Sequence, residues 1–151
     1  MGAESEVLPD LLALRRLPLD AGEAIAHVTC ADAGGIDVFI GTTRAESHPQ
    51  LGELAALEYD AYEEMALAQI RQITSAARQR WPIARAAVLH RLGRCAVGEP
   101  SVVIAVACPH RGEAFEACRY VIDELKKLVP IWKRDVYARG ALWRHDGAGP
   151  G

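Results

Sequence analysis

An apolar run near the centre of the chain, Val102–Cys108, constrains the fold more than any other feature. Together with Ser101 it places apolar residues on both alternating faces of an extended segment. A strand of this kind is stable only inside a sheet that other elements cover on both sides. The run is also far shorter than the roughly 20 residues that span a bilayer. We therefore expect a central strand in a layered domain.

Two long segments with helical periodicity accompany this strand. The first, Glu63–Trp81, ends at Pro82, and the second, Arg111–Val129, ends at Pro130. Each repeats apolar residues every three or four positions, as a helix with one buried face does. In the second segment the predicted buried stripe is Ala114, Phe115, Cys118, Val121, Ile122, Leu125 and Val129.

Shorter elements complete the pattern. Asp20 can cap a short helix over Ala21–Val28. We expect extended segments at 36–40, 54–59, 83–90 and 131–137, turns at 31–35 and 92–98, and a polar loop at 45–53. The order is roughly βαββαββαβ without an internal repeat, which predicts an α+β fold, a mixed β-sheet with packed helices.

The length and charge of the chain limit its organisation and partners. A chain of 151 residues is long enough for one core but not for two full domains. We expect a flexible lead-in over residues 1–13, a single domain over residues 14–143 and a flexible tail over residues 144–151. The net charge of −3 argues against nucleic acid or an anionic membrane as a partner.

The cysteines and the start of the chain indicate the compartment. The four cysteines have no C-x-x-C spacing, which argues against both a zinc site and a disulfide scaffold. The first residues lack a basic segment followed by an apolar one, so we expect no signal peptide. The sequence therefore predicts a reduced, cytoplasmic protein without a metal site.

Basic residues lie at both ends of the second long helix. His110 and Arg111 stand at its start, where unpaired N–H groups and the helix dipole favour an anion. Lys126 falls within about 20° of Phe115 on a helical wheel, so it either reaches water or lines a pocket. If Lys133 converges on Lys126, each lowers the other's pKa, which makes a lysine a usable base. The alternative at either end is a solvated helix terminus.

Strand ends carry further candidates. Arg44 follows a predicted strand and precedes a loop, a position that often carries function on a rigid scaffold. His90, Arg91 and Arg94 lie near the end of another predicted strand, where we expect them to be solvated.

Four segments of the chain are informative together: Gly41–Arg44, Leu57–Met65, Ala107–Ala117 and Leu125–Arg134. In combination they resemble the large, catalytic subunit of molybdopterin synthase, and the resemblance spans about Leu17 to Trp143. It implies an α/β hammerhead fold and a homodimer. Each subunit would bind one small ubiquitin-like subunit, giving a heterotetramer.

The resemblance also implies an activity. The enzyme transfers two sulfurs from the C-terminal thiocarboxylate of the small subunit into cyclic pyranopterin monophosphate, which yields molybdopterin for the molybdenum cofactor. Lys126 and Lys133 would be catalytic, and Arg44, His110, Arg111 and Arg134 would bind substrate. The small subunit supplies the sulfur, so no permanently bound cofactor is expected. The alternative is a non-catalytic module that binds a phosphorylated ligand in the same basic pocket.

Two points complicate the resemblance. Family members often carry Arg-x-His-Asn and then glycine after the strand-end arginine, whereas here the histidine is displaced to His48. Arg111 and Lys126 are also fifteen residues apart on one helix, or about 22 Å. A composite site would resolve this distance, with Lys126 and Lys133 from one subunit and His110 and Arg111 from its dimer mate. The rival geometry keeps all of these residues in one chain.

Overall fold

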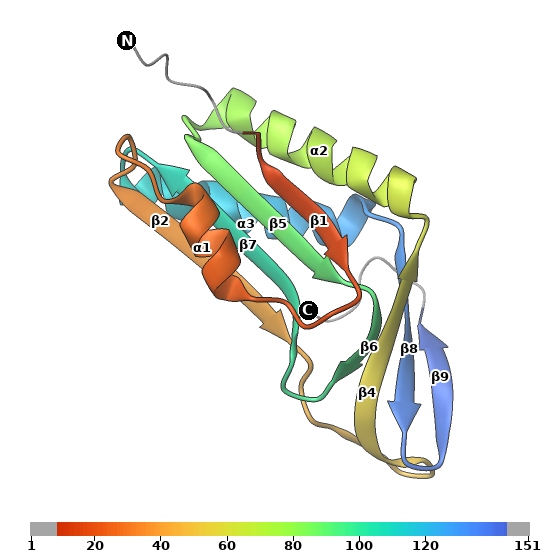
Figure 1. The fold of residues 1–151 in the computed structure, drawn as a ribbon. Helices are drawn as coiled ribbons and strands as arrows, with labels where there is room; N and C mark the ends of the chain where they lie inside the picture. Colours follow the sequence, from red (N-terminus) through yellow and green to blue (C-terminus); the bar gives the residue numbers. More distant parts are fainter. Residues whose placement is uncertain (1–8, 145–151) are drawn as a thin grey trace.

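The computed structural model describes residues 9–144, which form a helix-covered main sheet of four strands and a second sheet of five strands beside one end of it (Figure 1). The helices are α1 (Ala21–Val28), α2 (Glu63–Arg80) and α3 (Arg111–Leu128). The strands are β1 (Leu11–Arg15), β2 (Gly35–Thr42), β3 (Ser47–His48), β4 (Gly52–Ala61), β5 (Arg85–Arg91), β6 (Gly93–Ala96), β7 (Pro100–Cys108), β8 (Ile131–Tyr137) and β9 (Gly140–Arg144). None of the helices in this range is long and apolar enough to cross a membrane.

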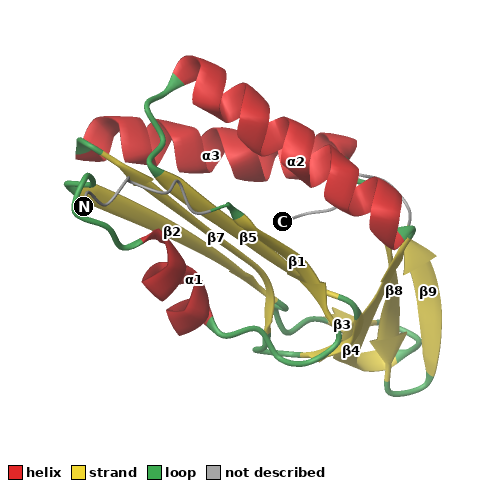
Figure 2. Ribbon diagram, turned by 45° about the horizontal axis from the view of Figure 1, so that its top comes forward, coloured by secondary structure: helices red, strands yellow, loops and turns green. Residues whose placement is uncertain are grey.

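The main sheet has the strand order β1-β5-β7-β2, which confirms that the apolar run forms an interior strand. Strand β1 is parallel to β5 and the other neighbours are antiparallel, so the sheet is mixed. Helix α1 covers one face, and α2 and α3 cover the other (Figure 2). Alternate residues of β7 enter the two cores: Val103, Ala105 and Ala107 on the α1 side, and Val102, Ile104, Val106 and Cys108 on the other.

The second sheet brings β8 against the long strand β4. Its order is β3-β4-β8-β9, with β6 also paired to β4. Strands β4 and β8 are antiparallel, and their register sets Tyr59 opposite Lys133 and Leu57 opposite Asp135. Because Pro130 ends the helical run, strand β8 starts directly beyond the last turn of α3. This junction positions the candidate site.

Four short strands lie where the sequence predicts none: β1, β3, β6 and β9. Each has five residues or fewer, too few to show an alternating pattern, and each is paired to a longer strand. The predicted lead-in therefore does not extend through residues 11–13, which pair with β5. Arg144 closes β9 and is not part of a tail. Residues 1–8 of the predicted lead-in and residues 145–151 of the predicted tail lie outside the described residues.

The predicted buried stripe of α3 is wrong at Phe115, which is 56% exposed. The buried positions of the helix are Ala114, Ala117, Cys118, Val121 and Leu125. Small side chains at Ala114 and Ala117 let the helix approach the sheet closely, and this face points away from Phe115. Lys126 lies at nearly the same wheel angle as Phe115 yet is half-buried, because at its end of the helix it lines a cavity, one of the two alternatives that the sequence leaves open.

Asp10 fastens the edge strand β1 to α2. Its carboxylate accepts hydrogen bonds from both terminal nitrogens of Arg78, at 2.5 and 2.6 Å, and from the backbone N–H of Ala86 at 3.2 Å. Bidentate pairs of this kind are the strong form of a charged hydrogen bond. The hydrogen bond to Asp10 raises the pKa of Arg78.

We expect Asp10→Ala to lower the free energy of unfolding by about 1.5–3 kcal/mol, because Arg78 loses its charged partner. The control is Glu63→Ala, which breaks an exposed ion pair with Arg16 at 3.3 Å. That pair should contribute less than about 1 kcal/mol. Denaturant titration measures both, and equally small losses would show that Asp10 does not anchor β1.

Candidate active site

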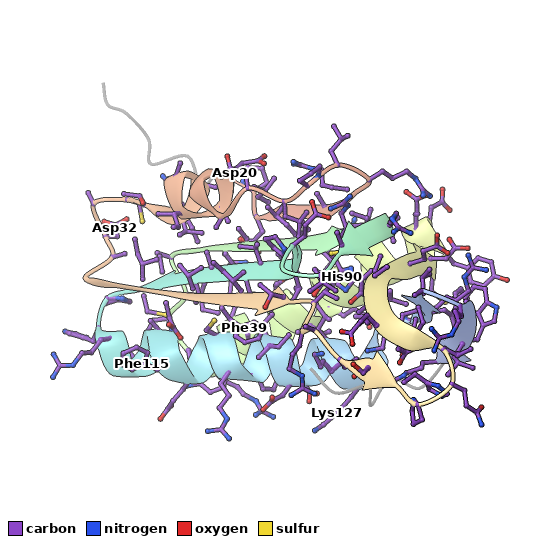
Figure 3. All side chains as sticks on the ribbon, turned by 90° about the horizontal axis from the view of Figure 1, so that it is seen from below. Asp20, Asp32, Phe39, His90, Phe115 and Lys127 are labelled. Carbon is purple, nitrogen blue, oxygen red and sulfur yellow. The ribbon has the colours of Figure 1, made fainter. Side chains whose placement is uncertain are left out.

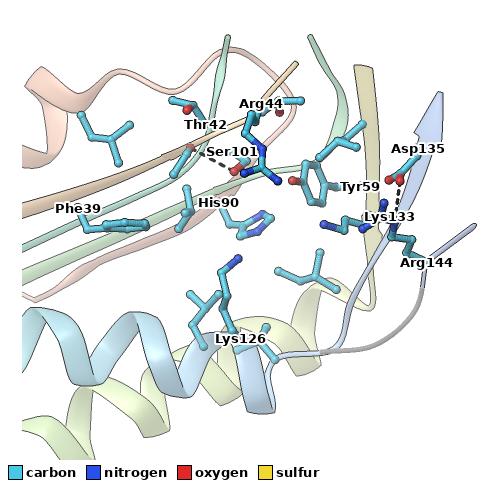
Figure 4. Close-up of a pocket in the computed structure, with 18 of the residues that line it drawn as sticks. Phe39, Thr42, Arg44, Tyr59, His90, Ser101, Lys126, Lys133, Asp135 and Arg144 are labelled. Carbon is cyan, nitrogen blue, oxygen red and sulfur yellow. Dashed lines mark hydrogen bonds and ion pairs between the residues drawn. The ribbon is translucent and has the colours of Figure 1, made fainter. Parts of the chain in front are cut away.

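A cavity of about 510 Å³ opens where the main sheet meets the end of α3 and the second sheet (Figure 4). Three of the predicted site residues line it: Arg44, Lys126 and Lys133. They come from the segment after β2, from α3 and from β8, so only the packing of the two sheets brings them together. The other polar residues of the lining are Thr42, Thr43, Glu46, Tyr59, His90, Ser101, Asp135 and Arg144.

The two lysines approach the cavity from either side of Pro130. Lys126 lies in the last turn of α3 and Lys133 in β8, and both side chains point into the cavity (Figure 4). Burial lowers the pKa of Lys126, and the positive charge of Lys133 lowers it further. The sequence predicts an effect between the lysines, whereas burial proves to be the larger cause. A lowered pKa raises the fraction of Lys126 that can accept a proton.

His90 and Arg91 are buried, so the prediction that they are solvated is wrong. They are 6% and 7% exposed, because β5 lies between β1 and β7 in the main sheet. The Nδ1 atom of His90 lies 2.7 Å from the carbonyl oxygen of Arg91. Burial lowers the pKa of His90 to about 4, despite this hydrogen bond, and the charge of Lys126 lowers it as well. The imidazole is therefore neutral at neutral pH. Arg94 is exposed, as predicted.

Tyr59 and Asp135 complete the walls. The ring of Tyr59 meets that of His90 edge-on, with centroids 5.1 Å apart. Burial raises the pKa of Tyr59 to about 12, so its hydroxyl keeps the proton. Asp135 is 1% exposed, and its Oδ2 lies 2.6 Å from Nε of Arg144. Asp135 follows Lys133 by two positions in a strand, so alternation alone could have indicated that they share a face.

His110 and Arg111 lie away from this cavity. They stand at the start of α3 and are exposed, with His110 Nδ1 at 3.6 Å from Oε1 of Glu113. Figure 3 shows α3 between Phe115 near its start and Lys127 near its end, with His90 toward the Lys127 end. Within one chain the structure does not join the two basic ends of the helix.

Arg134 also faces away from the cavity. It follows Lys133 directly in β8, and consecutive residues of a strand point to opposite faces. Its guanidinium pairs with Glu58 and lies 5.6 Å from the centre of the Trp143 ring. These side chains line a separate open hollow on the outer face of the second sheet.

The displaced histidine of the 45–53 loop has a local role. Nδ1 of His48 accepts hydrogen bonds from the backbone N–H groups of Gln50 and Leu51, each at 3.1 Å. It thus holds the turn between β3 and β4. Between residues 9 and 144 there is no group of three or more histidine, cysteine or acidic side chains that could hold a metal ion.

Comparisons with known proteins agree with one another. Residues 14–128 match the family described as MoaE protein. The molybdopterin synthase catalytic subunit of Pyrococcus abyssi is 44% identical over 122 residues, 80% of this chain and 80% of that protein. A solved molybdopterin synthase from Staphylococcus aureus has a TM-score of 0.82 and 29% identity, covering 88% of this chain and 96% of that one. A complex of subunits 1 and 2 of the molybdopterin-converting factor from Helicobacter pylori shares the fold, with a TM-score of 0.70 and 23% identity over 87% of this chain and 88% of that one.

Burial of a neutral His90 predicts a loss of stability in acid. Its pKa is about 4 in the folded chain, below the ordinary 6.5, so the unfolded chain binds more protons between these values. This stability is present above pH 6.5 and is lost as the pH falls toward 4. Between pH 6.5 and 4.5 we expect the wild type to lose roughly 2–3 kcal/mol more than His90→Gln.

Denaturant titrations at several pH values measure this difference. The control is His110→Gln, because the His110 side chain is 86% exposed, and this variant should follow the wild type. Parallel curves for wild type and His90→Gln would contradict a buried neutral imidazole.

Proposed function

Since the chain belongs to the MoaE protein family of molybdopterin synthase catalytic subunits, we propose that its cavity is where sulfur enters the pterin. The substrate is cyclic pyranopterin monophosphate. The sulfur comes from the C-terminal thiocarboxylate of a small ubiquitin-like subunit, and two transfers yield molybdopterin. The observation that carries this proposal is the meeting of Lys126, Lys133 and Arg44 in one cavity.

Substrate binding needs a partner for the cyclic phosphate. Arg44, just after the end of β2, lines the cavity, and a guanidinium binds phosphate oxygens through paired N–H groups. The cavity walls also carry apolar side chains such as Phe39 and Leu57, which can pack against a pterin ring. Charge and apolar surface therefore lie side by side, as a phosphorylated ring system requires.

The chemistry requires proton transfers. In each transfer the thiocarboxylate sulfur bonds to a substrate carbon as a carbon–oxygen bond at that carbon breaks; one oxygen stays on the phosphate and the other leaves as water. Water then cleaves each resulting thioester, which leaves a carboxylate on the small subunit and a thiolate on the substrate. Opening of the cyclic phosphate leaves a phosphate monoester. Lys126, with its lowered pKa, is suited to accept a proton in these steps, and Lys133 supplies a second amino group beside it. The sulfur donor is the partner, so the chain itself uses no resident cofactor.

The distance between the two basic ends of α3 bears on how the subunits assemble. We propose a homodimer within a heterotetramer, in which His110 and Arg111 act in the site of the dimer mate. Fifteen residues of helix separate Arg111 from Lys126, about 22 Å, which is long for one small ligand to bridge. Arg134, on the outer face of the second sheet, would act in substrate binding only through such a neighbouring subunit or a local rearrangement.

The cysteines support a reducing compartment. All four, Cys30, Cys95, Cys108 and Cys118, are free. Reduced thiols are normal in the cytoplasm, where we propose that this reaction takes place.

We expect Lys126→Ala and Lys133→Ala each to lower turnover by at least about 100-fold, the lower range for loss of a general acid or base. The control is Lys127→Ala, since that side chain is exposed and pairs with Glu124 at 3.4 Å. Formation of the dithiolene product from thiocarboxylated small subunit and cyclic pyranopterin monophosphate is followed directly. Wild-type protein that binds this substrate but never turns it over would favour the alternative of a non-catalytic binding module.

Mixed dimers test the composite site. Lys126→Ala and Arg111→Ala chains should each be inactive alone. If sites are shared, a mixed dimer has one doubly altered site and one intact site, so random pairing restores about a quarter of wild-type activity. If each site belongs to one chain, every site carries a substitution and co-assembly restores nothing.

A further inference from the structure

His90 is a buried polar group of the cavity to which the proposed sulfur transfer assigns no role. It is the last residue but one of β5, is 6% exposed, and lines the cavity together with Lys126 and Tyr59. A buried imidazole costs free energy unless its nitrogens find partners. Nδ1 has a partner in the chain, the carbonyl oxygen of Arg91, whereas Nε2 is available for a second one.

Two contacts fix the ring. A carbonyl oxygen only accepts, so the 2.7 Å contact with the Arg91 carbonyl requires that Nδ1 of His90 carries the proton. Arg91 is itself held, because its Nη2 donates to the carbonyl of Arg94 at 2.6 Å and its Nη1 lies 3.6 Å from Oε1 of Glu99. The edge-on contact with Tyr59 sets the tilt of the imidazole. In the neutral ring, Nε2 therefore carries only a lone pair.

The charges around the ring favour this neutral form. Lys126 from α3, Lys133 from β8 and Arg44 after β2 bring positive charge to the cavity. Asp135 is paired with Arg144 on the far wall, and Glu46 lies 3.6 Å from the same guanidinium, so both acids are engaged away from the imidazole. A protonated His90 would add another cation to this group. A neutral ring instead offers the cations an acceptor.

Lys126 is the cation from which His90 can accept a hydrogen bond. Figure 4 shows the amino group of Lys126 directed toward the imidazole of His90. The charge of Lys126 also contributes to the low pKa of His90, which requires the two groups to be near each other. An amino group that donates one hydrogen bond to a fixed acceptor keeps its remaining positions aimed in a defined direction.

We propose that His90 is a positioning residue for Lys126, its Nε2 accepting a hydrogen bond from the amino group and holding that group toward the substrate. This inference rests on the proposed function, in which Lys126 moves a proton. Protonated Nε2 would be a donor and would repel an ammonium group, so burial of the ring is what preserves the acceptor. The role requires no contact between His90 and the substrate.

Two substitutions separate this role from simple packing. His90→Leu keeps much of the volume and removes both nitrogens, whereas His90→Gln can place its amide oxygen near the position of Nε2. We expect kcat to fall at least about tenfold in His90→Leu, because a misaimed catalytic group loses part of the rate that orientation supplies. KM should change by less than about threefold, and His90→Gln should stay within about threefold of wild-type kcat. Retained kcat in His90→Leu, or equal losses in both variants, would overturn the proposal.

A second measurement needs neither sulfur donor nor substrate. NMR of the full chain with lysine labelled with carbon-13 at Cε reports the pKa of Lys126, assigned from the signal that Lys126→Ala removes. We expect that pKa to fall by roughly one unit in His90→Leu, because the ammonium form loses its acceptor, and to change little in His90→Gln. Lys127 is the internal control. An unchanged Lys126 pKa in His90→Leu contradicts the contact, whereas a shifted pKa in a protein that makes no dithiolene would refute only the proposed function.

Discussion

The burial of β7 on both faces is the constraint on which the rest of the structure depends. Its alternate side chains enter two separate cores, so helices must cover both sides of the main sheet. Burying a valine or isoleucine completely contributes roughly 1.5–3 kcal/mol, and this strand buries several. The same packing brings the end of α3 to the end of the sheet, where Lys126 meets the strand ends. The cavity is thus a consequence of how the core closes.

Several cationic side chains line the cavity, where they are partly shielded from water. Burial lowers the pKa of Lys126 more than the charge of its neighbour Lys133 does. The main determinant of this lysine's basicity is therefore how far the cavity removes it from water. The nearby imidazole of His90 is neutral, and Asp135 pairs with Arg144 on the opposite wall. The surroundings of Lys126, at the end of one helix, are therefore built by residues from three different strands. In the proposed enzyme, the residues around Lys126 set its pKa and so decide whether it can accept a proton.

Much of the fold could be predicted because its main elements are long and periodic. The two helices that end before Pro82 and Pro130 and the apolar strand β7 were predicted almost to the residue. The short strands were not, since pairing with a distant strand makes them and their own few residues carry no pattern. Phe115 was misplaced for a related reason: a wheel locates the apolar stripe, but the sheet decides which edge of it is buried.

By itself, the sequence determined the α+β class and the family, because these rest on local periodicity and contiguous motifs. It also predicted Lys126, Lys133 and Arg44 as candidate site residues, and all three line one cavity. Alternation along β8 already separates Lys133 and Asp135 from Arg134, but only the tertiary structure decided which of these two faces meets the cavity. The tertiary structure also decided that His90 is buried and neutral. It also separated the two basic ends of α3. The physical reason is that burial and pKa depend on segments far apart in the chain, which come together only when the two sheets pack.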